Sequence, residues 1–130
     1  MKEIAKLHKE TFGATVDLNT YIQDGMVIKK RGDELIGYVL FQLVADVADL
    51  HYIVIAPKHR QKGYGFQLMS QFLTHLVGAD VISVTLEVRR DNLAAIKLYE
   101  AFDFVCIHIR KKYYKDGSDA LLMEKIIVKK

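Results

Sequence analysis

Hydrophobic and polar positions follow two kinds of pattern along this chain, and each pattern predicts a different kind of secondary-structure element. Apolar residues recur at helical spacing in the segments 2–11, 17–22, 63–78 and 92–101. Runs dense in β-branched and aromatic residues predict strands at 26–28, 35–44, 49–55, 81–88, 104–112 and 120–128. Turn residues at 31–33 and 115–118 join neighbouring strands into hairpins.

The order of these elements predicts the fold class. A strand, helix, strand, helix run occupies 49–101, and such a run brings its strands together as a parallel pair with a right-handed crossover. The hairpins on either side add antiparallel neighbours. We therefore expect an α/β fold with a single domain over 1–130, in which helices flank a mixed, mostly antiparallel sheet with a central parallel pair.

Several positions in these elements carry specific expectations. The helix over 63–78 should turn an apolar stripe to the core, formed by Phe66, Met69, Phe72, Leu73 and Leu76. The strand over 81–88 should bury one face and leave the other polar, with Ile82, Val84, Leu86 and Val88 opposed to Ser83, Thr85 and Glu87. Asp91 is a suitable N-cap for the next helix, and Asp103 suits a left-handed turn after it.

Composition narrows the classes of function. With 51% hydrophobic residues the chain can bury a core, and a net charge of +3 is too small to indicate a nucleic-acid-binding protein. Polar side chains interrupt the longest uncharged stretch, Gly63–Ala79, and residues 1–10 contain no apolar signal core, so we expect neither a membrane span nor export. The single cysteine, Cys106, can form no internal disulfide, should be buried in its strand, and fits a reducing cytoplasm.

The segment most informative about function is Arg60–Phe66, a glycine-containing loop between a predicted strand and a predicted helix. In such a loop, backbone N–H groups and the positive helix N-terminus converge on an anion, and glycines keep Cβ atoms away from a phosphate. The loop has Leu68 where a dinucleotide fingerprint needs a third glycine, and it lacks the Gly-Lys-Ser/Thr run of a Walker-type loop, which disfavours NAD and ATP. A plain strand-to-helix turn would explain the same residues.

Other side chains are candidates for chemistry. Glu87 stands at the carboxyl end of a predicted parallel strand, where ligands gather in open α/β sheets, although an isolated glutamate there is more often solvated. Asn92 and Tyr99 share one face of a predicted helix, where a tyrosine is more often a packing residue. The histidines show no metal-binding spacing and no Gly-x-Ser-x-Gly elbow is present, so we expect neither a metal site nor a serine nucleophile.

Together these segments form a longer pattern. It runs through Ile53–Pro57, Arg60-x-x-Gly63-x-Gly65, Leu86–Arg89, Asn92, Ala95 and Leu98–Glu100. This pattern resembles the GNAT superfamily of N-acetyltransferases, whose acetyl-coenzyme A loop has the form Gln/Arg-x-x-Gly-x-Gly/Ala. Arg110–Tyr114, Asp116–Ala120 and Met123 are similar to the closing hairpin of the RimI-type ribosomal-protein-alanine N-acetyltransferases, and the resemblance covers residues 36–123.

The resemblance implies a role for each of these residues. Acetyl-coenzyme A (acetyl-CoA) would be held by Ile53, Val54 and Ile55, by Arg60, Gln61, Lys62, Gly63, Tyr64, Gly65 and Phe66, and by Asn92. Glu87 would be the general base, Tyr99 the general acid, and Tyr113 and Tyr114 would bind the acceptor. The sequence departs from the superfamily at Asp103, which replaces a usual glycine, and in its short N-terminal part, which lacks the usual first strand and helps to form the acceptor groove.

The function implied is direct transfer of an acetyl group from acetyl-CoA to a protein N-terminal α-amine, with a ribosomal protein as one candidate acceptor. The chemistry agrees, because a peptide α-amine with a pKa near 8 is roughly a tenth neutral at pH 7, far more than a lysine. Alternatives are transfer to a lysine or a small-molecule amine, and a non-catalytic acetyl-CoA-binding module that would need neither Glu87 nor Tyr99. We expect no nucleic acid, membrane or metal partner.

Overall fold

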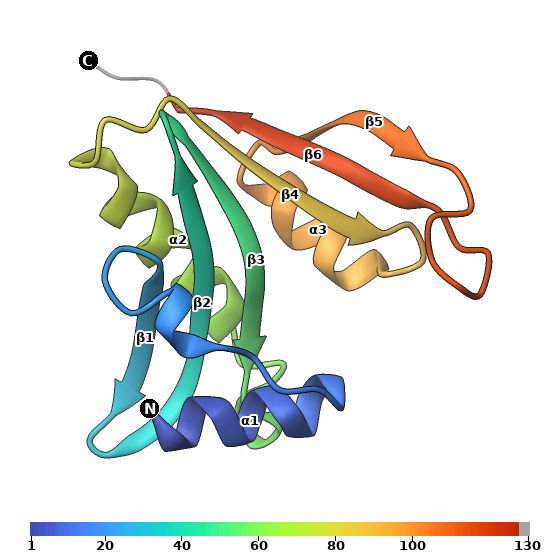
Figure 1. The fold of residues 1–130 in the computed structure, drawn as a ribbon. Coiled ribbons are helices and arrows are strands. Elements are labelled where there is room, and N and C mark those ends of the chain that lie inside the picture. Colours follow the sequence, from blue (N-terminus) through green and yellow to red (C-terminus); the bar gives the residue numbers. More distant parts are fainter. Residues whose placement is uncertain (128–130) are drawn as a thin grey trace.

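The computed structural model describes residues 1–127, which form a six-stranded sheet with helices against it (Figure 1). The helical elements are α1 (Lys2–Phe12), η1 (Leu18–Thr20), η2 (Pro57–His59), α2 (Tyr64–Val77) and α3 (Leu93–Ala101). The strands are β1 (Met26–Arg31), β2 (Glu34–Val44), β3 (Val47–Ile55), β4 (Ser83–Arg89), β5 (Val105–Arg110) and β6 (Ala120–Ile126). Their order is β1-β2-β3-β4-β6-β5, in which β3 and β4 pair in parallel and the other neighbours pair antiparallel. The expected mixed α/β fold is confirmed.

The sheet divides between β3 and β4. These strands pair from Val47 to Leu50 and from Ser83 to Leu86, and then separate, although β3 continues to Ile55 and β4 to Arg89. Figure 1 shows them leaving a common region and spreading apart. We call this opening the split. It separates a half-sheet made of β1, β2 and β3 from a half-sheet made of β4, β6 and β5.

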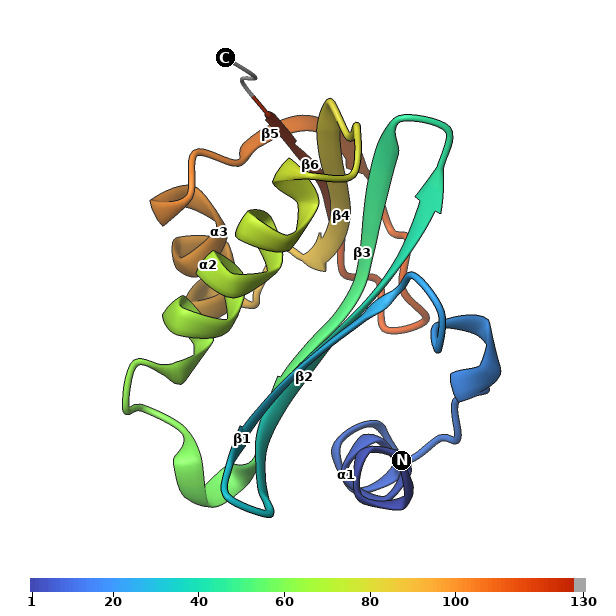
Figure 2. The same ribbon diagram turned by 90° about the vertical axis from the view of Figure 1, so that its left-hand side faces the viewer.

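Helices lie on both faces of the sheet (Figure 2). On one face lie α2 and α3, over a core in which Phe41, Phe72 and Phe104 are at most 2% exposed. On the opposite face α1 covers the half-sheet of β1, β2 and β3, where Ile4 packs in one cluster with Tyr38. The three- and four-residue spacing of apolar positions in α1 and α2 explains why each helix buries one side.

A bulge in β3 lies where the sheet divides. The register against β2 jumps from Leu50 to Tyr52, which leaves His51 as an extra residue. Because of this insertion, Leu50 and Ile53 both pack in the layer under α2, although residues three apart in an unbroken strand face opposite sides. The bulge therefore resets which side chains of β3 face the helices just before the strand leaves β4.

Three expectations about burial are wrong. Phe66 is 54% exposed on the first turn of α2, and its ring packs 4.5 Å from the ring of Phe102 instead of entering the core. Ile82 precedes β4 and is 50% exposed, whereas Ser83, expected on the polar face, is 5% exposed. Cys106 is exposed because β5 is the edge strand of the sheet and most of its residues are uncovered.

The ends of α3 agree only in part with expectation. Asn92 is the N-cap, since its Oδ1 accepts a backbone N–H of the first turn at 3.2 Å, while Asp91 instead forms an ion pair with β4. An aspartate cap was expected one residue too early because either side chain can cap a helix. Asp103 has a φ of 69°, the left-handed conformation that was expected. Val128, the expected end of the last strand, lies outside the described residues.

Candidate functional site

The unpaired edge of β3 forms the first part of the site. The backbone N–H of Ala56 donates to the carbonyl of Ile36 on β2 at 2.8 Å. Because successive strand residues direct their N–H and C=O groups to opposite sides, Ile53 and Ile55 turn theirs away from β2 and toward the split. From that side the Nε of Arg60 donates to the Ile55 carbonyl at 2.9 Å. These two isoleucines therefore present backbone groups where a ligand could bind.

Val54 lies differently from its neighbours. Its side chain is 4% exposed and packs in the layer under α1. The same alternation directs its backbone N–H and C=O toward β2, away from the split. Of the three strand residues expected to hold the cofactor, Val54 therefore offers no backbone group on the open edge.

The glycine loop leads from this edge into α2. Gln61 and Gly63 have φ values of 61° and 85°, left-handed conformations that turn the chain sharply. Helix α2 begins at Tyr64 with no side-chain cap, and the N–H of Gln67 donates to the carbonyl of Gly63 at 3.2 Å. The N–H groups of the first turn have no side-chain acceptor, and an anion can bind them together with the positive end of the helix.

Gly65 lies in that first turn with open space beside it. A Cβ added there would meet only the Cδ2 of Leu98 within 4 Å, at 3.7 Å, which is an ordinary van der Waals contact. The packing of residues 1–127 therefore does not require glycine at this position. It leaves room for a ligand to lie against the helix N-terminus, with exposed Lys62 and Phe66 beside it.

Polar contacts fix the loop to the β1–β2 hairpin. Glu34, the first residue of β2, accepts hydrogen bonds from Lys58 and from the Nε2 of His59, the latter at 2.8 Å. The hydrogen bond from Lys58, above all, holds the pKa of Glu34 below its ordinary value. The hydroxyl of Tyr64 accepts from Arg31 of β1. The β1–β2 hairpin therefore holds both the residues before the glycine loop and the first residue of α2.

Across the split, Glu87 lies near the end of β4 with the predicted acceptor residues around it. The Nε of Arg110 forms an ion pair with the Oε2 of Glu87 at 3.0 Å, and the Arg110 guanidinium lies 5.5 Å from the centre of the Tyr113 ring. The rings of Tyr113 and Tyr114 meet edge to face, 5.2 Å apart. Burial first, and the charge of Glu87 second, raise the pKa of the Tyr114 hydroxyl. The structure therefore brings Glu87, Tyr113 and Tyr114 together.

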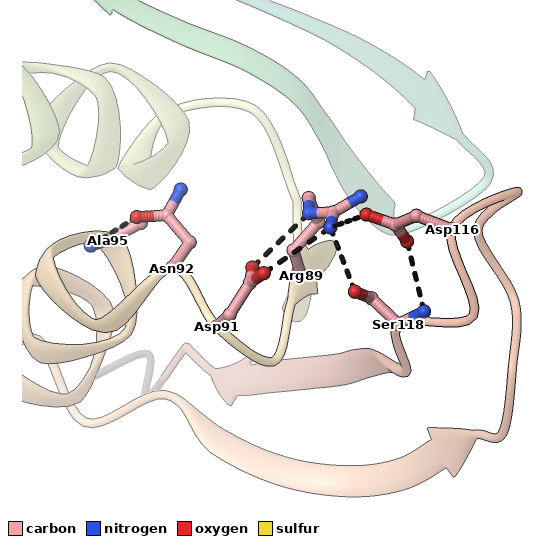
Figure 3. A network of polar contacts seen from close by, with 6 residues as sticks. All are labelled: Arg89, Asp91, Asn92, Ala95, Asp116 and Ser118. Atoms are coloured by element: carbon pink, nitrogen blue, oxygen red, sulfur yellow. Dashed lines mark hydrogen bonds and ion pairs between the residues drawn. The ribbon is translucent and has the colours of Figure 1, made fainter.

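A network around Arg89 holds the loop that carries these tyrosines (Figure 3). Arg89, the last residue of β4, donates to Asp91, Asp116 and Ser118, and its guanidinium lies 4.7 Å from the centre of the Tyr114 ring. The hydrogen bond from Arg89 is the largest of the effects that lower the pKa of Asp116 to about 2. The pair is therefore fully charged at neutral pH. It fixes Tyr114 relative to the end of β4.

Asn92 and Tyr99 belong to α3, on the face of the sheet opposite Glu87. Asn92 uses its Oδ1 for capping, and Figure 3 shows its amide nitrogen pointing away from the bond. Tyr99 is 7% exposed, and burial raises its pKa to about 12. No hydrogen bond joins its hydroxyl to another of residues 1–127. Tyr99 thus stays a protonated phenol at neutral pH, and no contact joins it to Glu87.

The sequence analysis missed two residues of the site. Asp49 and His51 of β3 line a cavity of about 190 Å³ together with Leu50, Tyr52 and Glu87. Polar residues within a largely apolar strand were the available signal, but alternation alone also fits a plain solvent-facing side. A larger hollow of about 480 Å³ between η1 and β2 contains none of the predicted site residues.

No helix within residues 1–127 is long and apolar enough to cross a membrane. Nowhere in the same range do three or more His, Cys, Asp or Glu side chains gather in a way that could hold a metal ion.

Comparisons with known proteins identify the family. The model of the acetyltransferase (GNAT) family matches residues 3–104. The ribosomal protein bS18-alanine N-acetyltransferase of Salmonella typhimurium is 34% identical over 94 residues, which make up 70% of this chain and 64% of that protein. The matched region is thus slightly under two thirds of the length of this curated relative.

Solved structures give the same result. The ribosomal-protein-S18-alanine N-acetyltransferase of Escherichia coli superposes with a TM-score of 0.81 and 28% identity, over 97% of this chain and 88% of that one. An acetyltransferase of Bacillus subtilis in complex with CoA gives a TM-score of 0.84 over 98% and 93% of the two chains, and its 15% identity shows the fold alone. This chain belongs to the acetyltransferase (GNAT) family.

Proposed function

We propose that this protein transfers the acetyl group of acetyl-CoA directly to the α-amine at a protein N-terminus, with a ribosomal protein as the candidate acceptor. One observation carries the proposal. The split leaves an unpaired strand edge that runs from the glycine loop, at the far end of β3, to the Glu87 cavity near the point where β3 and β4 part. A long, thin cosubstrate with an anionic end and a reactive end matches this arrangement.

The residues present fit acetyl-CoA. The uncapped first turn of α2 suits a pyrophosphate, and the absent side chain at Gly65 leaves space for it. The turned-out backbone groups of Ile53 and Ile55 suit the amides of a pantetheine arm, and the free amide nitrogen of Asn92 can donate a further hydrogen bond. When bound, acetyl-CoA would supply an activated acetyl group as a thioester.

Glu87 and Tyr99 would serve the transfer as base and acid. Glu87 would take a proton from the acceptor ammonium, directly or through water, which frees the nitrogen lone pair to form the new C–N bond. As the C–S bond breaks, the Tyr99 hydroxyl would give its proton to the departing thiolate. The nitrogen would lose its second proton as the amide forms, directly or through water to the Tyr99 phenolate, and Glu87 would release its own proton to solvent. The two residues belong to opposite faces of the sheet, so each would reach the reacting carbon from its own side of the split.

The acceptor assignment draws on the relatives and on the tyrosine hairpin. The proteins of Salmonella typhimurium and Escherichia coli are named for an alanine of a ribosomal protein. Tyr113 and Tyr114 stand beside Glu87 and would grip a peptide that places its N-terminus there. A pair of aromatic rings suits a peptide better than a small polar amine.

The proposal is tested by measuring CoA release with three kinds of acceptor. We expect rapid release with peptides that carry a free N-terminus, and mass spectrometry should place the acetyl group on the α-nitrogen. The matched controls are the same peptides with a blocked N-terminus and an internal lysine. They should cause no release of CoA. Faster release with lysine peptides or small amines would contradict the acceptor class, and acetyl-CoA binding without any release would support a non-catalytic module.

A further inference from the structure

A chain of hydrogen bonds runs from a buried tyrosine to the Glu87 cavity. The hydroxyl of Tyr21, a residue only 6% exposed, lies 2.8 Å from the Nδ1 of His51. The Nε2 of His51 lies 3.1 Å from the Oδ2 of Asp49. A carboxylate can only accept, so Nε2 carries a proton and, in the neutral ring, Nδ1 accepts from Tyr21. Burial raises the pKa of Tyr21, which keeps its hydroxyl a donor.

This series of hydrogen bonds ends on the carboxylate of Asp49, and a residue of β4 holds the same carboxylate from the other side. Thr85 of β4 donates to the Oδ1 of Asp49 at 3.0 Å, so both oxygens have protein donors. Asp49 and Thr85 are directly paired in the parallel ladder, and Glu87 is two residues further along β4 on the same face. Asp49 and Glu87 therefore border one cavity, about 190 Å³ in volume, where the split begins.

The two carboxylates differ in charge compensation. Glu87 is ion-paired with Arg110. Among residues 1–127, no lysine or arginine forms an ion pair with Asp49, whose side chain remains 47% exposed. Asp49 is therefore the carboxylate in this cavity that has no lysine or arginine partner within that range. Hydrogen bonds from His51 and Thr85 hold it in place, so it is available to pair with a cation that enters.

The acceptor arrives as such a cation. A peptide α-amine with a pKa near 8 is mostly an ammonium at pH 7, and only its neutral form attacks a thioester. A site that first binds the ammonium and then removes its proton needs two groups, one to hold the charge and one to accept the proton. The cavity offers two carboxylates on facing strands for these tasks.

We propose that Asp49 is the anchor for the ammonium group of the acceptor, and that Tyr21 and His51 are positioning residues that aim its carboxylate. The inference rests on the proposed function, because it assigns Asp49 to the acceptor of that reaction. It adds a specificity determinant: the anchor favours acceptors whose amine is charged. Binding at Asp49 involves no covalent step, and the proton is still taken by Glu87.

The test uses calorimetry on the CoA-bound protein with two peptides that differ only at the N-terminus. One carries an N,N-dimethylglycyl group, which is a tertiary ammonium at pH 7, and the other carries a 3-methylbutanoyl group, its uncharged isostere. Neither can yield a stable amide product. The parent should bind the charged peptide at least about tenfold more tightly, as expected of a charge-assisted hydrogen bond.

Asp49→Asn keeps the shape of the side chain and removes its charge. The hydrogen-bond chain survives, because the amide can donate to His51, whose other nitrogen then donates to Tyr21. We expect this variant to bind the two peptides equally. Asp46→Asn, the same change at an exposed residue of the β2–β3 turn, should keep the parental ratio. Equal binding by the parent, or an unchanged ratio in Asp49→Asn, would overturn the anchor.

Tyr21→Phe tests the positioning residues without touching the charge. The ring stays and the hydroxyl is lost, so the charged-to-neutral binding ratio should fall a few-fold while the melting temperature changes little. A parental ratio in this variant would contradict the positioning role. Because these measurements need no turnover, they separate the two ideas: if no amine releases CoA, the proposed function fails while the charge preference can still be present.

Discussion

The two half-sheets contribute to the site by different means. The half-sheet of β1, β2 and β3 offers mainly backbone groups: the turned-out amides of β3 and the uncapped first turn of α2. The half-sheet of β4, β6 and β5 offers side chains, with Glu87, Arg110 and the paired tyrosines held by the Arg89 network. Backbone groups bind a common feature such as a phosphate, whereas a side-chain cluster can change with each acceptor. We therefore expect cofactor and acceptor binding to be separable by mutation.

The largest effect is expected on the chemical step. Glu87→Gln removes the base and Tyr99→Phe removes the proton donor, and each should lower turnover by about 10²–10⁴ with little change in acetyl-CoA affinity. Single-turnover kinetics would measure this step, with calorimetry for the cofactor. Near-parental turnover in both variants would remove these residues from the mechanism.

The pH dependence of the two variants should differ. Raising the pH should restore part of the rate of Glu87→Gln, because more acceptor amine is then neutral without help. The deficit of Tyr99→Phe should stay constant between pH 7 and pH 10, because burial raises the Tyr99 pKa to about 12 and the parental phenol keeps its proton there. A deficit that vanishes by pH 9 would contradict this assignment.

The next largest effect is expected on the binding of acetyl-CoA by the backbone groups at the start of α2. Gly65→Val should weaken acetyl-CoA binding by at least roughly tenfold, because its methyl groups would occupy the space beside the first turn of α2. Gly65→Ala should have a smaller effect on binding and is the graded control. Calorimetry measures the affinity, and thermal unfolding should show little or no loss, since a Cβ meets only Leu98. Equal affinity in parent and Gly65→Val would exclude a phosphate cradle.

A smaller effect is expected on the acceptor side. Tyr114→Ala removes a ring that packs on Arg89 and Tyr113, and it should raise the peptide KM several-fold while leaving the acetyl-CoA KM nearly unchanged. Steady-state kinetics with each substrate varied in turn would show the difference. The reverse pattern would assign the hairpin to the cofactor, and the two half-sheets would then not be separable.

The smallest effect concerns the Arg89 network. In the parent, the Asp116 carboxyl should titrate at a pKa of about 2, and Arg89→Gln should return it toward its ordinary value of 3.8. NMR titration of the side-chain carboxyl carbon would measure both. Because the folded pKa is lowered, the network stabilises the fold above about pH 4 and loses this contribution as the pH falls toward 2. The stability difference between parent and variant should shrink over the same range.

The sequence predicts the backbone side of the site well. The loop at 60–66 is short and contiguous, so its glycines and the start of the helix after it can be inferred from neighbouring residues alone. The placement of Ile53 and Ile55 at the open edge also follows the family resemblance. Val54 shows the limit, because it is the register against β2, and not the motif, that decides which backbone groups face the split.

The side-chain contacts of the site are harder to predict because they join distant segments. The bulge at His51 and the chain from Tyr21 to Asp49 depend on how β3 fits against β2, β4 and η1, which no local pattern contains. The exposure of Cys106 follows from the edge position of β5. Asn92 caps α3 while Asp91 accepts from Arg89 of β4, and a local pattern does not distinguish these two roles.

Amide hydrogen exchange can report whether a ligand occupies the split. The N–H groups of Ile53 and Ile55 lie in the middle of a sheet yet face the split, so in the free protein they should exchange with solvent far faster than the N–H of Val54, which bonds to β2. Occupation of the edge by a ligand would slow these two amides selectively. The difference in exchange rate between alternate amides of β3 would then show whether a ligand lies along the open edge of the strand.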